Sequence, residues 1–304
     1  MYDFIGDIHG HADKLCELLE KLGYSRKNGV YQHSERKVFF LGDYIDRGKQ
    51  IKETLSLVRN MVESGSALAI MGNHEYNAVM FYYPEKEGGH LRKHEIKNII
   101  QHFETLKAFE NNQAEYESWL DWFLTLPLYH ETEQFRAVHA CWDHKRIEFL
   151  RNKLIDNKLT SELVYESAVA ESEMYFAIED TLKGKELTIP DNIIYKDKNG
   201  FQRKEIRIKW WEDMSLATYK SISVEKIDHL PDLKIPDNLI ISDYYGENEK
   251  PVFFGHYWLH LNTNPGFFKN NICCLDYSVA KHGQLAAYRF DGEQTLDWQK
   301  VVMV

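Results

Sequence analysis

Three short polar turns hold the residues of this chain that are best suited to chemistry. Each turn follows an apolar run and combines glycine with acids, amides or imidazoles: Gly6-Asp7-Ile8-His9-Gly10, Gly42-Asp43-Tyr44-Ile45-Asp46-Arg47-Gly48 and Gly72-Asn73-His74-Glu75. Taken alone, each could be an ordinary Gly-Asp turn or a helix N-cap beside a solvated histidine. Their repetition after successive apolar runs instead indicates one site with metal-type ligands.

The segments around these turns predict strands that are followed by helices. Apolar runs predict strands over residues 37–41 and 67–71, and apolar residues at helical spacing predict helices over 11–22 and 51–63. Strands that alternate with helices of this length pair in parallel through right-handed crossovers. Turns at the carboxyl ends of such strands gather at one edge of the sheet, where ligands bind. The three polar turns are therefore expected to converge.

The rest of the chain divides into a helical stretch, an inserted segment and a β-rich end. Residues 76–126 have a helical pattern, clearest over 90–109, and strands are predicted at 128–131 and 135–138, just before His139. Charged, helix-favouring segments with a polar loop at 196–200 predict a partly helical cap over about 143–246, inserted into a single domain that spans residues 1–304. Further strands are predicted at 252–254, just before His256, and at 272–275, 285–290 and 295–301.

The strand ends supply nitrogen and oxygen ligands without sulfur. The carboxylate of Asp43 could bridge two cations, while Asn73, His139 and His256 offer an amide oxygen and two imidazoles. Such a set suits Mn, Fe, Zn or Co better than Ca or Mg. The other histidines are not part of such a motif at the end of a predicted strand, and we interpret them as surface or packing residues. They are His33, His90, His94, His102, His130, His144, His229, His260 and His282.

The net charge, the cysteine content and the distribution of apolar residues restrict the binding partners and the cellular location that we expect. The net charge of −10 and the pI near 5.8 argue against sequence-independent binding to nucleic acid or to an anionic membrane, although a local basic pocket is compatible with them. The four cysteines form no CxxC pair, which suits a reducing compartment. No charged segment followed by an apolar one opens the chain, and no run of about 18 apolar residues follows. We therefore expect a cytoplasmic protein.

The ordered trio of polar motifs resembles the phosphoprotein phosphatase family of calcineurin-like metallophosphoesterases. The resemblance covers residues 1–80 and resumes at Ala137-Val138-His139, Phe254-Gly255-His256 and Leu275-Asp276, but not in the middle insertion. It implies a four-layer αββα sandwich around a dinuclear metal centre. The implied ligands are Asp7 and His9 for the first ion, Asp43 as the bridge, and Asn73, His139 and His256 for the second ion.

The resemblance also implies a hydrolytic mechanism without a covalent phosphoenzyme. Two divalent ions, expected to be Mn with Fe, Zn or Co as alternatives, would activate a hydroxide for in-line attack on phosphorus. His74 would act as general acid with Asp46 orienting its ring, and Arg47 would bind phosphate oxygens. The family adds a second phosphate-binding arginine, for which Arg207 is preferred over Arg203. Trp210 and Trp211 nearby are either core residues or a stacking surface.

Two departures from the family pattern bear on the substrate. Ala140-Cys141 follows His139 where small glycines are usual, and the tyrosine-containing loop of eukaryotic protein phosphatases near the C-terminus is missing. Leu275-Asp276-Tyr277-Ser278 instead resembles the Leu-Asp-Thr-Gly turn of bacterial dinucleoside tetraphosphatases. The implied branch is thus bacterial.

We expect a metallophosphoesterase acting on a phosphorylated protein or nucleotide. The first hypothesis is a serine/threonine-type protein phosphatase, the second a dinucleoside polyphosphate hydrolase such as one for diadenosine tetraphosphate, and the third a nucleic-acid end phosphatase, against which the acidic balance counts. A metal-free binding scaffold is the alternative of another class. The complete set of implied ligands and acid speaks against it.

Overall fold

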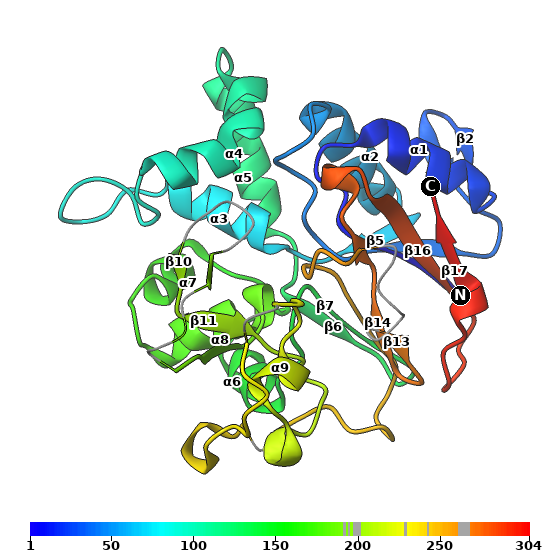
Figure 1. The fold of residues 1–304 in the computed structure, drawn as a ribbon. Coiled ribbons are helices and arrows are strands. Elements are labelled where there is room, and N and C mark those ends of the chain that lie inside the picture. Colours follow the sequence, from blue (N-terminus) through cyan, green and yellow to red (C-terminus); the bar gives the residue numbers. More distant parts are fainter. Residues whose placement is uncertain (191–192, 194, 197–201, 228–229, 242, 261–267) are drawn as a thin grey trace.

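Two β-sheets packed face to face form the centre of the protein (Figure 1). The computed structural model describes residues 1–190, 193, 195–196, 202–227, 230–241, 243–260 and 268–304. The first sheet has the order β15-β16-β1-β4-β5, with β17 beside β16. Its strands are β1 (Tyr2–Ile5), β4 (Lys37–Phe40), β5 (Ala67–Ala69), β15 (Asp276–Tyr277), β16 (Gln284–Phe290) and β17 (Val301–Met303). β1, β4 and β5 pair in parallel, as the strand–helix alternation predicts.

The second sheet has the order β13-β14-β12-β7-β6. Its strands are β6 (Tyr129–Glu131), β7 (Arg136–Val138), β12 (Val252–Phe254), β13 (Phe268–Lys269) and β14 (Ile272–Cys274). β12 pairs in parallel with both β7 and β14. The carboxyl ends of β7 and β12 therefore lie side by side, which brings the residues that follow them together.

Aromatic side chains from both sheets fill the space between them. The rings of Phe4 in β1 and Phe253 in β12 stack with centroids 3.7 Å apart, and both side chains are fully buried. Phe135 packs edge-on against Phe4, with ring centroids 5.0 Å apart. These contacts set the spacing of the two sheets.

Helices complete the outer layers of the predicted αββα sandwich (Figure 1). α1 (Ala12–Lys21) and α2 (Ile51–Glu63) pack on the first sheet. α6 (His144–Lys153), α7 (Ser161–Ser167) and α8 (Glu173–Lys183) lie beside the second sheet. α3 (Asn73–Tyr82), α4 (Ile96–Phe109) and α5 (Gln113–Leu124) connect the two halves. A small hairpin of β2 (Ser25–Lys27) and β3 (Val30–Gln32) precedes β4.

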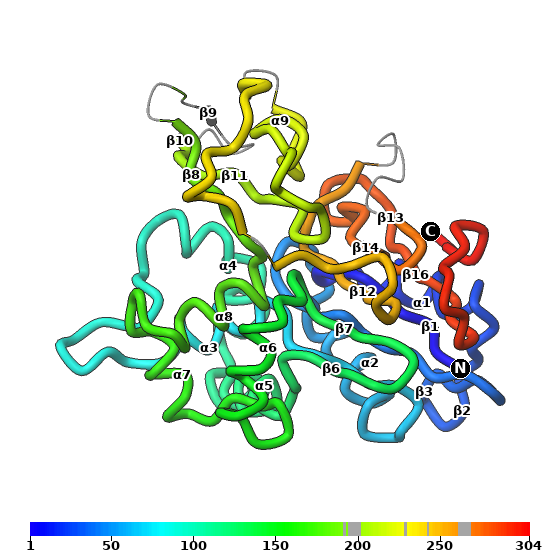
Figure 2. Tube along the Cα trace, turned by 90° about the horizontal axis from the view of Figure 1, so that it is seen from below, coloured from blue at the N-terminus to red at the C-terminus, as the bar shows by residue number. Residues whose placement is uncertain are grey.

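The segment predicted as a cap contains two different structures. Helices α6–α8 contribute buried residues to the main core. The following strands β8 (Glu186–Thr188), β9 (Tyr195–Lys196), β10 (Gln202–Arg203) and β11 (Glu205–Arg207), together with α9 (Tyr219–Ile222), lie to one side (Figure 2). Residues between Leu187 and Ile235 form a second, separate hydrophobic core there. The predicted polar loop at 196–200 lies, apart from Lys196, outside the described residues.

Three element boundaries differ from the prediction. The helix predicted from residue 90 begins at Ile96, because Pro84 and His90 form a β-bridge across a turn with left-handed Gly88 and Gly89. The predicted strand 295–301 is wrong: Asp297 caps a 3₁₀ turn by accepting the N–H of Gln299, and β17 starts only at Val301. The strand predicted at 67–71 ends at Ala69.

Two further properties bear on the sequence expectations. Cys16, Cys141, Cys273 and Cys274 are all free thiols. Within the described ranges, none of the helices combines the length and apolar character needed to cross a membrane.

The stacked pair between the sheets yields a stability prediction. Phe253→Ala removes a fully buried ring and leaves a cavity against Phe4, so the free energy of unfolding should fall by about 3–5 kcal/mol in urea denaturation. The matched control is Phe103→Ala in α4, whose side chain is 51 % exposed and should cost under about 1 kcal/mol. Equal losses for both variants would show that the intersheet contact does not carry this stability.

Candidate metal centre and phosphate pocket

Two groups of side chains bring metal-type ligand atoms within 4.8 Å of one another in the described part of the chain. The first group is His9, Asp43 and His74, and the second is Asp43, His139 and His256. They follow β1, β4, β7 and β12 or begin α3, so the polar turns meet at one edge. Asp43 belongs to both groups, which is the position a bridging carboxylate needs.

The Asp43 carboxylate is held in place before any ligand arrives. Its Oδ1 accepts the backbone N–H of His74 at 3.0 Å and lies 3.3 Å from His139 Nε2, while Oδ2 lies 3.6 Å from His9 Nε2. Burial alone would raise the pKa of Asp43, but the neighbouring imidazoles of His139 and His74 hold it well below its usual value. A Cβ on Gly72 would come within 2.2 Å of Asp43 Oδ1, so only glycine allows this approach.

His9 presents a bare nitrogen to Asp43. Its Nδ1 donates to the carbonyl oxygen of Ile45 at 2.9 Å, and its buried Nε2 has no hydrogen-bond partner. Burial and the nearby His74 lower the pKa of His9 to about 3, which keeps its ring neutral. A neutral imidazole whose lone pair faces a carboxylate fits a cation between the two.

The second group repeats this pattern around Asn73. His139 Nδ1 donates to the Leu41 carbonyl oxygen at 2.8 Å, and its Nε2 lies within hydrogen-bond distance of Asn73 Oδ1, 3.0 Å away. Burial would lower the pKa of His139, but Asp43 raises it above its usual value. His256 Nδ1 lies 2.8 Å from the same amide oxygen. His256 Nε2 is buried and has no hydrogen-bond partner. A buried imidazole nitrogen without a partner fits a positively charged ion.

Asp7 lies next to these groups, against Asp276. Its carboxylate accepts the backbone N–H of His256 at 3.1 Å, and a Cβ on Gly255 would come within 1.9 Å of it. Burial, then the carboxylates of Asp276 and Asp43, raise the pKa of Asp7 well above its usual value. Asp276 was noted in the sequence only as part of a motif. Buried acids gathered in this way also favour a cation.

His74 and Asp46 form a buried pair as predicted. His74 Nδ1 donates to Asp46 Oδ2 at 2.5 Å, which turns Nε2 toward the Asp43 side, 3.8 Å from its carboxylate. Burial would lower the pKa of His74, but Asp43 and Asp46 raise it above its usual value. Burial would raise the pKa of Asp46, but His102 and His74 hold it well below its usual range.

His102 and Thr105 were not predicted to belong to this site. His102 in α4 is buried, donates from Nδ1 to Asp46 Oδ1 at 2.8 Å, and has Nε2 2.8 Å from the hydroxyl of Tyr116. Thr105 donates to the same Asp46 oxygen at 2.6 Å. The interpretation of His102 as an ordinary packing residue is therefore incomplete. Its spacing to Thr105 on one helix face was the available signal.

Several of these residues have a left-handed backbone. The angle φ is 48° at His9, 56° at Asp43, 68° at Asp46, 65° at Arg47 and 72° at His256. Non-glycine residues adopt such values at a cost, and they cluster at functional sites where the surrounding structure enforces them.

Arg47 lies beside Trp258 at this edge. Its guanidinium carbon is 5.4 Å from the centre of the Trp258 ring, and its buried Nε has no hydrogen-bond partner. Trp258 is partly exposed and its ring centroid lies 5.8 Å from that of His9. Trp258 is thus the aromatic surface at the site. The alternative of a stacking role for Trp210 or Trp211 is wrong, because both are buried against Phe254 in the core.

A pocket of about 510 Å³ opens beside Asn73 and His256. Arg207 of β11 lines it, as does Arg203, so both candidates for a second phosphate-binding arginine lie at the pocket. Burial and then Arg207 lower the pKa of His256, which indicates that the guanidinium is close to this ring. Arg92, Lys183 and Tyr175 also line the pocket and were not singled out in the sequence.

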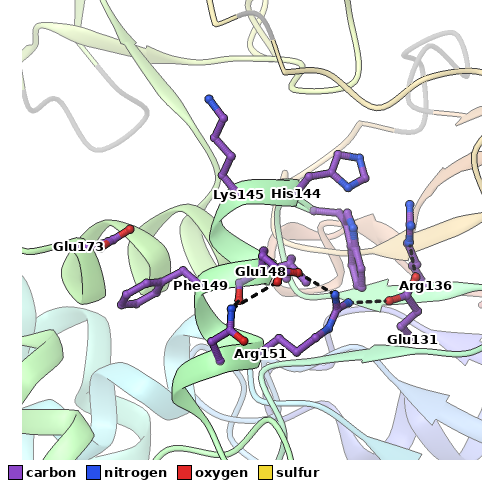
Figure 3. A pocket seen from close by; sticks show the side chains of 11 residues that line it. Glu131, Arg136, His144, Lys145, Glu148, Phe149, Arg151 and Glu173 are labelled. Carbon is purple, nitrogen blue, oxygen red and sulfur yellow. Dashed lines mark hydrogen bonds and ion pairs between the residues drawn. The ribbon is translucent and has the colours of Figure 1, made fainter.

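A larger pocket of about 760 Å³ lies elsewhere, between α6 and the strands β6 and β7 (Figure 3). Several of its charged residues pair with one another: Arg151 with Glu131 and Glu148, and Arg136 with Glu131 (Figure 3). None of the residues of the two ligand groups lines it. The pocket of about 510 Å³, by contrast, is lined by His256 of the second ligand group.

Curated relatives of this chain are named as tetraphosphatases. One from Oceanobacillus iheyensis, named bis(5′-nucleosyl)-tetraphosphatase (asymmetrical), is 33% identical over 139 residues, 45% of this chain and 54% of the relative. One from Marinomonas sp., named bis(5′-nucleosyl)-tetraphosphatase, symmetrical, is 31% identical over 95% of this chain and 94% of its own length. The chain thus spans about half the length of the first relative and nearly all of the second.

Comparison with solved structures supports the fold alone. A cold-active protein tyrosine phosphatase superposes with a TM-score of 0.50 and 16% identity, covering 99% of this chain and 78% of that one. The model of the calcineurin-like phosphoesterase family matches residues 2–257, which include both ligand groups. The chain therefore belongs to the calcineurin-like phosphoesterase family.

Proposed function

We propose that this protein is a metal-dependent hydrolase of dinucleoside tetraphosphates. The observation that carries the proposal is the pair of ligand groups that share Asp43 beside a pocket lined by arginines. The choice of substrate is supported by the names of the relatives, one of which is matched over 94% of its length. Neither the family nor these relatives point specifically to a phosphoprotein, so the nucleotide takes the place of the protein phosphatase hypothesis.

We propose two divalent ions at the centre, with Mn as the first candidate and Fe, Zn or Co as alternatives. Asp7 and His9 would hold the first ion, Asp43 would bridge, and Asn73, His139 and His256 would hold the second. The unpartnered nitrogens of His9 and His256 and the shared position of Asp43 support this division. Such ions supply Lewis acidity toward water and the phosphate oxygens.

The remaining residues bind the substrate and move a proton. His74 Nε2, turned toward the centre by Asp46, would donate a proton to the oxygen that leaves phosphorus. Arg47 and Arg207 would each donate N–H groups to phosphate oxygens, since a guanidinium matches them with two parallel hydrogen bonds. Trp258, which already packs against Arg47, offers an apolar face near the attacked phosphate.

A substrate panel tests the proposed function. With Mn present, diadenosine tetraphosphate should be hydrolysed with a kcat/KM at least about tenfold above that of a phosphoserine peptide, and a chelator should abolish the reaction. Chromatography of the products distinguishes cleavage at the centre, which yields two nucleoside diphosphates, from cleavage that yields a mono- and a triphosphate. Preference for the phosphopeptide would return the protein phosphatase hypothesis to first place. No turnover with any of the four metals would favour a binding scaffold.

The shared position of Asp43 yields a second test. Asp43→Asn keeps the side-chain shape but removes the charge that would bridge the ions, so activity should fall by at least about a thousandfold and both metals should bind less tightly. Metal content after gel filtration measures the second effect. Asp291→Asn, in an ion pair with Arg36 far from the centre, is the control and should keep both metals. Loss of a single ion in Asp43→Asn would contradict the bridging role.

His102 is proposed as a positioning residue that acts through Asp46 and His74. His74→Asn should lower kcat by at least about a hundredfold with the metals retained. His102→Ala removes one of the groups that fix Asp46 and should lower kcat by about tenfold. Because both changes act on one proton donor, His102→Ala should have little further effect when His74 is already Asn.

The double variant separates positioning from a general structural role. If the losses in kcat of the two single variants multiply in the double variant, His102 acts independently of His74. The proposal that His102 positions His74 through Asp46 would then be wrong. His94→Ala is the matched control, since His94 stacks on Phe81 near the same helices but does not contact Asp46. Its kcat should stay within about threefold of the parent.

A further inference from the structure

Arg92 is held at the pocket by two neutral amides. Its Nη1 donates to Asn77 Oδ1 in α3 at 3.1 Å, and its Nη2 donates to Gln101 Oε1 in α4 at 2.9 Å. The Arg92 backbone N–H donates to the Met80 carbonyl oxygen at 2.8 Å, which ties the loop to α3. The guanidinium is therefore oriented in advance between two helices.

The charge of Arg92 is not compensated by a direct carboxylate partner. Among the described residues it forms no ion pair, whereas the nearby acids already have cationic partners: Glu179 pairs with Lys183, and Asp46 with His74 and His102. The side chain is partly buried, and burial lowers the pKa of the guanidinium. Glu179 and Asp46 offset part of this effect from a distance, but the side-chain hydrogen bonds of the guanidinium go to two neutral amides. An anion that bound directly would therefore gain a strong charged contact.

Arg92 lies close enough to the proposed metal centre to contact an anion that is bound there. Arg92 lines the same pocket of about 510 Å³ as Asn73 and His256 of the proposed metal centre, and Arg207. It also lines the small space next to His74 and Asp46. The pocket is within the usual range of about 300–1,000 Å³ for small-molecule sites, so it can take more than one phosphate group.

We propose that Arg92, oriented by Asn77 and Gln101, binds a second phosphate of the substrate, next to the phosphate attacked at the metal centre. This inference rests on the proposed function and deepens it, because it makes the protein selective for anions with at least two linked phosphates. A phosphomonoester would leave the Arg92 subsite unused. The two amides leave part of the guanidinium fork for phosphate oxygens.

Substrate selectivity provides the first test. In Arg92→Met, the ratio of kcat/KM for diadenosine tetraphosphate to that for p-nitrophenyl phosphate should fall about tenfold to a hundredfold, the effect of losing a charged hydrogen-bonded contact. Arg151→Met removes an equal charge from an exposed arginine of the other pocket and should leave the ratio unchanged. An unchanged ratio in Arg92→Met would overturn the proposal.

A second variant keeps the test decisive if Arg92→Met folds poorly. Gln101→Glu is nearly isosteric and places a carboxylate on the guanidinium, so it should lower the same ratio by competing with the phosphate. Gln299→Glu, in the turn after Asp297, is the matched control for an added negative charge. A normal ratio in Gln101→Glu would contradict a free anion subsite at Arg92.

Calorimetry separates this inference from the proposed function. Pyrophosphate should bind the Mn-loaded protein at least about tenfold more weakly in Arg92→Met than in the parent, while the affinity for orthophosphate changes much less. This result would support the subsite even if the parent did not cleave dinucleoside tetraphosphates, in which case the proposed substrate alone would be wrong. Equal changes for both anions would overturn the subsite while leaving the proposed function intact.

Discussion

The carboxylate of Glu75 holds two of the three polar turns together. It is fully buried, and it accepts the backbone N–H groups of Asp43 at 2.9 Å, Tyr44 at 2.8 Å and Gly72 at 3.0 Å. These amides lie beyond the ends of β4 and β5, where strand pairing no longer satisfies them. Each would cost about 1–3 kcal/mol if left unpaired in the interior. Glu75 lies in the first turn of α3, where the helix dipole also favours an anion. Together with the backbone hydrogen bonds from Ile8 and His9 to the Asp43 carbonyl oxygen, it fixes the position of Asp43.

Sheet packing supplies the other half of the geometry. His9 and Asp43 follow strands of the first sheet, whereas His139 and His256 follow strands of the second. The distance between these pairs is set by the aromatic layer in which Phe4 stacks on Phe253. A rigid core of this kind can hold buried acids, bare imidazole nitrogens and left-handed backbone in place, because relaxing any of them would disturb close packing. The unfavourable free energy of these buried polar groups and of the left-handed backbone is thus offset by packing in the core between the sheets.

The sequence predicts site residues well where reactive side chains directly follow a predicted strand. The motifs around Asp7, Asp43 and Asn73 follow apolar runs, so strand order alone predicts that they meet. Strand order does not predict His102 and Arg92, because His102 reaches the site from α4 and Arg92 from the loop before it. For His102 the available signal was its helical spacing to Thr105. The sequence also does not show whether a pair of tryptophans points into the core or into a binding site. Trp210 and Trp211 proved to be core residues, while the aromatic surface at the site is Trp258.

The charge of the protein and of the pocket bears on how the proposed anionic substrate would be recognised. The protein carries a net charge of −10, so its surface does not attract a polyphosphate over distances beyond about 8–10 Å, the screening length in physiological salt. The pocket beside His256 is lined by five cationic and four acidic side chains, and Arg207 lies 4.0 Å from the carboxylate of Glu186. Arg92 forms no ion pair with a described residue. Affinity must then come from short, directed hydrogen bonds made after contact. Orientation by two amides suits the proposed subsite at Arg92, because amides fix the direction of the guanidinium without neutralising the charge that a phosphate would need.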